Sequence, residues 1–184
     1  MNETCEIQVD DKIFVPYISE IKLQEIVAHV AHEISCDYAG KSPLFLVVLN
    51  GAFMFAADVL RKINTTCDIS FIKLSSYDGL STTGEVKQLI GLNENIEGRD
   101  IVIIEDIVDT GITLFNLKKD LIQHRPNSIK IATLFFKQES LKVDLKVDYH
   151  GMIIGKEFIV GYGLDYNGKG RNLNEVYIIK EDNL

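Results

Sequence analysis

Cysteine is scarce in this sequence, and no apolar run is long enough to cross a membrane. The three cysteines, Cys5, Cys36 and Cys67, lie far apart and form no CxxC pair or metal-ligand pattern with histidine. This spacing excludes a disulfide framework and indicates reduced thiols. No stretch approaches the roughly 20 apolar residues of a membrane helix. The segment MNETCEIQVDD is acidic and polar, unlike a secretory signal or transit peptide, so we expect a cytoplasmic protein with no membrane partner.

Positive charge is also limited. The chain has 19 lysines and arginines against 27 aspartates and glutamates, which gives a formal net charge of −8. Non-specific affinity for nucleic acid comes from Lys and Arg that neutralise phosphates, so we expect no nucleic-acid partner. An anionic ligand would need local cations, backbone amides or a divalent metal to overcome the overall negative field.

No internal repeat, low-complexity tract or Pro/Gly-rich linker divides the 184 residues. Hydrophobic residues make up 46% and charged residues 25%, a balance typical of soluble globular proteins. The length fits one domain of ordinary size with a substantial core. We therefore predict a single domain over residues 1–184.

Apolar periodicity predicts helices that alternate with strands. The predicted helices are residues 18–38, with Ser19 as N-cap, 52–63 and the second half of 100–124. The predicted strands are 44–49, 67–76, the first part of 100–124, 128–136, and segments within 153–166 and 176–180. This alternation predicts an α/β domain with a mainly parallel sheet, whose ligands bind at the carboxyl ends of the strands.

The strongest functional signal is the segment IVIIEDIVDTGIT at residues 101–113. Four aliphatic residues predict a buried strand that ends at two adjacent carboxylates, Glu105 and Asp106, with Asp109 three residues further on. Thr110, Gly111, Ile112 and Thr113 then open a helix, whose free N–H groups and positive dipole end suit a phosphate. Each residue alone could belong to a solvated turn or an N-cap, but the combination favours a phosphate site.

This segment resembles the phosphoribosyl-pyrophosphate signature of the type I phosphoribosyltransferases, and further motifs are similar to the hypoxanthine-guanine branch. The resemblance implies a central, mainly parallel sheet flanked by helices, with a small hood over the active site. It implies that Glu105 and Asp106 hold the ribose hydroxyls, directly or through metal-bound water. It also implies that residues 109–113 cradle the 5′-phosphate and that Asp109 is the general base for purine N7.

A second group of residues is similar to the family's purine pocket. Lys137 follows a predicted strand, and the resemblance implies that it donates to the 6-oxo oxygen of the base. The string FIVGYGLDYNGKGRNL begins at Phe158 and resembles the family's FVVGYxLDY segment. It implies that Phe158 stacks on the base, that the backbone near Ile159 contacts its edge, that Asp165 binds a second Mg²⁺ and that Arg171 contacts pyrophosphate. A lone lysine or arginine would more often be a surface charge.

Two loops complete the resemblance, each with a qualification. Asn50 and Gly51 lie between a predicted strand and helix, where backbone amides suit pyrophosphate. The family commonly has lysine at the place of Asn50, so we expect weaker pyrophosphate binding here. Ser76 and Tyr77 begin a polar loop that resembles the family's mobile lid, although such a loop could also be a plain connector. Ile112 also replaces a common lysine, with little expected consequence.

The resemblance implies a purine salvage enzyme. Such an enzyme transfers the 5-phosphoribosyl group from phosphoribosyl pyrophosphate to N9 of hypoxanthine or guanine with Mg²⁺, and gives IMP or GMP and pyrophosphate. Family members are usually homodimers or homotetramers. The alternative is a nucleotide-sensing regulatory protein on the same fold, but that class needs a basic surface or an added nucleic-acid module. The sequence does not rank hypoxanthine, guanine and xanthine.

Overall fold

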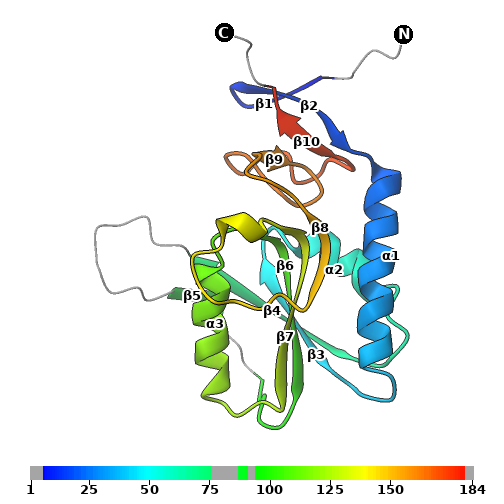
Figure 1. Cartoon of the computed structure of the whole chain (residues 1–184), viewed down its shortest axis with the longest axis vertical. Coiled ribbons are helices and arrows are strands. Elements are labelled where there is room, and N and C mark those ends of the chain that lie inside the picture. Colours follow the sequence, from blue (N-terminus) through cyan, green and yellow to red (C-terminus); the bar gives the residue numbers. More distant parts are fainter. Residues whose placement is uncertain (1–5, 76–86, 91–93, 181–184) are drawn as a thin grey trace.

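The computed structural model describes residues 6–75, 87–90 and 94–180 and contains two sheets (Figure 1). The larger sheet has the strand order β5-β4-β3-β6-β7-β8. Its strands are β3 (Leu44–Leu49), β4 (Asp68–Ser75), β5 (Lys87–Ile90), β6 (Asp100–Val108), β7 (Ser128–Phe136) and β8 (Tyr149–Ile153). All neighbouring pairs are parallel except β4 and β5. The mainly parallel sheet predicted from the sequence is therefore confirmed.

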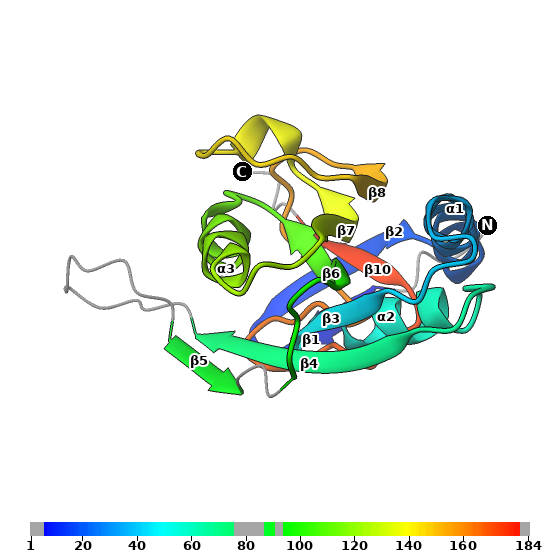
Figure 2. The same cartoon turned by 90° about the horizontal axis from the view of Figure 1, so that it is seen from below.

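Helices cover both faces of this sheet (Figure 2). The helices α1 (Glu20–Asp37) and α2 (Phe53–Leu60) lie on one face, and α3 (Ile112–Ile122) lies on the other. Strand β3 shows why its sequence is apolar throughout: Phe45 packs toward α1 and α2, while Leu46 packs toward α3. Ser19 caps α1, as predicted, because its side chain accepts a hydrogen bond from the Lys22 N–H.

The smaller sheet is antiparallel and has the order β1-β2-β10-β9. Its strands are β1 (Ile7–Val9), β2 (Lys12–Ile18), β9 (Ile159–Val160) and β10 (Val176–Ile179). It has its own apolar cluster around Phe14 and Val160 and lies beyond the end of the larger sheet (Figure 1). This is the hood that the sequence resemblance implies, although its hairpin of β1 and β2 was not predicted.

Two predicted elements are shorter than the sequence indicates. The helix predicted over 52–63 ends at Leu60. The strand material predicted over 153–166 is mostly loop, with only β8's last residue and β9 extended. The chain leaves β9 because Gly161, Tyr162 and Gly163 all have positive φ, outside the ordinary β region of backbone angles. No helix in the described ranges is both long and apolar enough to cross a membrane.

Candidate active site

The carboxyl ends of β3, β6 and β7 meet below the hood, and most of the predicted site residues lie there (Figure 1). The structure places the predicted residues as follows: Asn50 and Gly51 after β3, Glu105 and Asp106 in β6, Asp109 to Thr113 after β6, and Lys137 after β7. Phe158, Ile159, Asp165 and Arg171 come from the hood. Ser76 and Tyr77 lie outside the described residues.

The acid pair lies within β6 instead of after it, which corrects the predicted end of the strand. Pairing of β6 with β7 continues to Val108, whereas pairing with β3 extends only to Ile104. The last part of β6 is therefore an open edge on the β3 side. Here the Asp106 N–H donates to Glu105 Oε1 at 3.1 Å, and the Ile107 N–H donates to Asp106 Oδ1 at 2.8 Å.

The electrostatics of this pair favour a cationic or hydrogen-bond-donating ligand. Burial, followed by the negative charge of Asp106, raises the pKa of the Glu105 carboxyl well above its ordinary value. Two ionised carboxylates side by side in a partly buried edge are costly without a partner. A divalent metal or the hydroxyls of a sugar would lower that cost.

The loop after β3 packs directly on the acid pair. A Cβ at Gly51 would lie 1.6 Å from Asp106 Oδ2, so only glycine leaves room for that carboxylate. The peptide bond between Leu49 and Asn50 is cis. The Asn50–Gly51 loop and the β6 edge thus form one continuous surface.

A cavity of about 210 Å³ lies at the start of α3. It is lined by Glu105, Ile107, Val108, Asp109, Thr110, Gly111, Thr113 and Leu114. Gly111 is the N-cap residue of α3, with φ of 74°, and no side chain caps the helix there. The first N–H groups of α3 therefore lack a side-chain partner at the cavity, an arrangement that suits an anion.

Lys137 and Asp109 form an ion pair beside this cavity. Lys137 Nζ lies 3.2 Å from Asp109 Oδ2, and only 11% of the lysine side chain is exposed against 50% of the aspartate. The lysine is held in place because its backbone N–H donates to the Val108 carbonyl at 2.9 Å. The structure thus brings the predicted base and the predicted purine ligand together from neighbouring strands.

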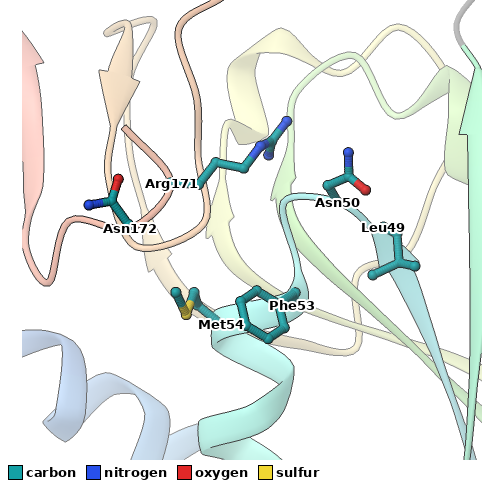
Figure 3. Close-up of a pocket in the computed structure, with 6 residues that line it drawn as sticks. All are labelled: Leu49, Asn50, Phe53, Met54, Arg171 and Asn172. Carbon is teal, nitrogen blue, oxygen red and sulfur yellow. The ribbon is translucent and has the colours of Figure 1, made fainter. Parts of the chain in front are cut away.

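A second cavity, of about 320 Å³, lies between the start of α2 and the hood (Figure 3). It is lined by Leu49, Asn50, Phe53, Met54, Arg171 and Asn172. Arg171 extends toward Asn50, whereas Asn172 points the other way (Figure 3). Arg171 is fixed by Asp165 Oδ1 at 2.6 Å and by the Gly163 carbonyl at 2.7 Å. Phe53, Met54 and Asn172 were not predicted from the sequence, where the first two have the pattern of ordinary helix residues.

Phe158 lies on the hood with 45% of its surface exposed. Tyr166 packs edge-on against its ring at a centroid distance of 5.7 Å, and Phe14 supports it at 6.3 Å. The neighbouring Ile159 is buried at the start of β9. This packing holds an exposed aromatic ring in a fixed orientation, as stacking on a base requires.

Comparisons with known proteins agree with this geometry. Residues 19–167 match the family model "Phosphoribosyl transferase domain". The hypoxanthine-guanine phosphoribosyltransferases of Streptococcus agalactiae and Streptococcus thermophilus are 48% and 46% identical over 151 and 154 residues. These alignments cover 82% and 83% of this chain and 84% and 86% of those proteins.

A solved structure extends the similarity to three dimensions. The hypoxanthine-guanine phosphoribosyltransferase of Bacillus anthracis, with a HEPES molecule in its active site, has a TM-score of 0.86 and 41% identity. The match covers 96% of this chain and 99% of that one. The family model, the relatives and this structure agree with the resemblance that the sequence motifs carry. The chain therefore belongs to the phosphoribosyltransferase family, in its hypoxanthine-guanine branch.

Proposed function

We propose that this protein transfers the phosphoribosyl group of phosphoribosyl pyrophosphate to hypoxanthine or guanine. The relatives that it matches over most of their length carry the name of that activity. The observation that carries the proposal is the convergence of the Glu105–Asp106 pair, the cavity at α3 and the Lys137–Asp109 ion pair at one edge of the sheet.

The cavity at the start of α3 is the proposed 5′-phosphate site. The helix N-terminus supplies N–H donors and a positive dipole end, and Thr110 and Thr113 add hydroxyl donors. Glu105 and Asp106 then lie where the ribose ring of the same ligand would follow. Their carboxylates accept hydrogen bonds from hydroxyls, which compensates for the cost of their burial.

Magnesium fits the carboxylates at this site. Within the described residues, no three His, Cys, Asp or Glu side chains gather closely enough to hold a metal by themselves. Mg²⁺ is commonly held by one or two carboxylates together with substrate phosphates. Burial, followed by the charge of Asp106, raises the pKa of Glu105, and a bound cation would favour the ionised form. Glu105 and Asp106 are the proposed ligands of one ion and Asp165 of a second, which would neutralise the departing pyrophosphate.

The chemistry then depends on charge placement. Purine N9 bonds to the anomeric carbon as the bond between that carbon and pyrophosphate breaks, and positive charge develops on the sugar. Carboxylates beside the ribose stabilise this charge. Asp109 accepts the proton from purine N7, a general-base role that contributes about 10²–10⁴-fold.

Lys137 is the residue proposed to recognise the 6-oxo group of the purine. Its ammonium has donors and no acceptor, so it satisfies the oxygen of a 6-oxopurine but meets the amino group of adenine donor to donor. An unpaired buried donor costs about 1–3 kcal/mol, which favours hypoxanthine and guanine. The ion pair with Asp109 holds Lys137 beside the proposed base.

A turnover assay tests this function. Purified protein is supplied with phosphoribosyl pyrophosphate, Mg²⁺ and, separately, hypoxanthine, guanine, xanthine and adenine. We expect turnover of a 6-oxopurine and a fall in kcat of about 10²-fold or more for Asp109→Asn, because the base is lost. Asp120→Asn, an exposed carboxylate on α3, is the matched control and should retain full activity. Folded protein that converts none of the four purines would contradict the proposal.

The family resemblance also favours a cytoplasmic homodimer or homotetramer. The chain's mass of 20.7 kDa makes these states easy to separate by light scattering coupled to size-exclusion chromatography. A mass near 41 or 83 kDa, two or four times 20.7 kDa, is expected.

A further inference from the structure

Asp58 on α2 joins three parts of the chain that are far apart in sequence. Its Oδ2 accepts a hydrogen bond from the Tyr162 hydroxyl at 2.5 Å and another from Gln24 Nε2 at 2.8 Å. Gln24 lies on α1, and Tyr162 lies in the loop that follows β9. The side chain of Asp58 is 25% exposed, so these bonds are only partly open to water. The carboxylate therefore ties the hood loop to both helices on one face of the sheet.

Tyr162 has an unusual backbone that this bond helps to hold. Its φ is 49°, in the left-handed region that residues other than glycine rarely adopt. The tyrosine is 6% exposed, and its N–H donates to the Leu173 carbonyl at 2.9 Å. Burial, followed by the hydrogen bond to Asp58, raises the pKa of the Tyr162 hydroxyl, which keeps it a donor. The residue is thus fixed at its backbone and at the tip of its side chain.

The residues after Tyr162 connect it to the second cavity through their contacts with Arg171 and Gly51. The Gly163 carbonyl accepts from Arg171 Nη1 at 2.7 Å, and a Cβ at Gly163 would lie 2.1 Å from the Gly51 carbonyl oxygen. Asp165 then holds the other end of the Arg171 guanidinium at 2.6 Å. The direction of Arg171 toward Asn50 (Figure 3) therefore depends on where the loop lies against Gly51.

We propose that Tyr162 and Asp58 are positioning residues for the pyrophosphate end of the active site. Their hydrogen bond fixes the 161–165 loop so that Asp165 holds Arg171 in its direction toward Asn50 (Figure 3). The inference rests on the proposed function, in which Arg171 contacts pyrophosphate and Asp165 binds Mg²⁺. Loss of the bond loosens this end of the site and leaves Lys137, which is held by Asp109 and Val108, in place.

A matched control separates positioning from plain stability. Tyr149 is also a buried tyrosine, 4% exposed, whose hydroxyl donates to an aspartate, Asp37, at 2.7 Å. It begins β8 level with Ala132 in the middle of β7, but its hydroxyl, which also accepts from Lys130 Nζ at 3.0 Å, lies at the amino end of the sheet, away from the site. Tyr149→Phe and Tyr162→Phe therefore remove the same kind of bond from opposite ends of the sheet.

The experiment compares Tyr162→Phe, Asp58→Asn and Tyr149→Phe with the wild type. For Tyr162→Phe we expect the KM for phosphoribosyl pyrophosphate and the inhibition constant of pyrophosphate to rise about tenfold, the loss of one hydrogen bond to a charged group. The KM for hypoxanthine should rise less, to about twofold at most, since Lys137 is held from β6 and not from this loop. Asp58→Asn keeps one acceptor and should show a smaller rise. Tyr149→Phe should lose comparable thermal stability with both KM values unchanged.

Equal losses of stability in the two tyrosine variants, with an unchanged KM for phosphoribosyl pyrophosphate, would overturn the inference and leave the proposed function intact. An inactive wild type would instead overturn the proposed function. In that case, calorimetric titration with magnesium pyrophosphate still decides the point, because the inference requires weaker binding by Tyr162→Phe than by Tyr149→Phe. Should Tyr162→Phe not fold, the same comparison is made with Asp58→Asn.

Discussion

The carboxylate of Asp106 lies directly over the backbone of Gly51, so close that a Cβ at Gly51 would be 1.6 Å from Oδ2 and 2.5 Å from Cγ. This contact joins the loop after β3 to the open edge of β6. One glycine therefore sets the position of an acid in the proposed ribose site. Residues 55 positions apart in sequence, 51 and 106, depend on one another for their geometry.

Gly51→Ala tests this dependence. The added methyl group must displace the Asp106 carboxylate, so we expect the KM for phosphoribosyl pyrophosphate to rise about 10- to 100-fold, the worth of one hydrogen bond to a charged group. The control is a double-mutant cycle with Asp106→Ala. If the methyl group acts through Asp106, then Gly51→Ala adds little to KM in the Asp106→Ala background. Additive effects would show that it acts elsewhere in the loop.

Glu105→Gln should weaken substrate binding and raise stability, and the gain in stability should depend on pH. The pKa of Glu105 is raised in the folded protein above its ordinary 4.5, so the folded state binds this proton more tightly than the unfolded state. The contribution of Glu105 to the free energy of unfolding is therefore greatest below pH 4.5 and is lost as pH rises through the folded pKa. Glutamine has no such dependence.

We therefore expect Glu105→Gln to match the wild-type Tm near pH 4 and to exceed it at pH 8 by about 2–4 °C, the shift that about 1 kcal/mol produces in a domain of this size. Its KM for phosphoribosyl pyrophosphate should rise, because glutamine is a weaker acceptor for ribose hydroxyls. Thermal unfolding across this pH range measures the first effect, with Asp120→Asn as the control. A Tm difference that stays constant with pH would contradict the assignment.

Lys137→Gln tests whether Lys137 recognises the purine. Glutamine keeps one donor group but loses the charge and the ion pair with Asp109. We expect kcat/KM for hypoxanthine to fall about 10- to 100-fold, the range for a lost hydrogen bond from a charged group. The ratio of hypoxanthine to adenine turnover should fall as well, since an amide also offers an acceptor to an amino group. Lys142→Gln, on an exposed lysine, should change neither value.

The sequence predicted the α/β core and the segment around β6 because the signals there are local. An apolar run, adjacent acids and a helix start at Gly111 all fall within 13 residues, 101–113. The end of β6 was predicted wrongly, because the strand continues where β7 still pairs with it. That pairing depends on a neighbouring strand, and the sequence at Glu105 and Asp106 does not indicate it.

The parts that the sequence did not predict depend on distant contacts. Tyr162 and Asp58 lie 104 positions apart, and only the folded chain brings the hydroxyl to its acceptor. The hairpin of β1 and β2 was missed for a different reason. Pro16 lies within β2, where proline normally argues against a paired strand, and it is tolerated at the register shift between β2 and β10.

Asn50 is the position where this chain departs most clearly from the family pattern, and Asn50→Lys tests what the departure does. Asn50 lines the second cavity opposite Arg171, the cation proposed to bind pyrophosphate (Figure 3). A lysine there adds a second positive charge at that cavity. We expect pyrophosphate to inhibit the variant about three- to fivefold more strongly, which corresponds to the ~1 kcal/mol of a solvent-exposed ion pair.

The control for this change comes from the same cavity. Asn172 lines it too, but its side chain points away from Arg171 (Figure 3). Asn172→Lys therefore adds the same charge but directs it away from the proposed pyrophosphate position. Inhibition by pyrophosphate should then change less than in Asn50→Lys. The difference should shrink at high salt, because screening weakens charges that are exposed to water. Equal effects of the two lysines would mean that only net charge matters, and that the asparagine does not set product release.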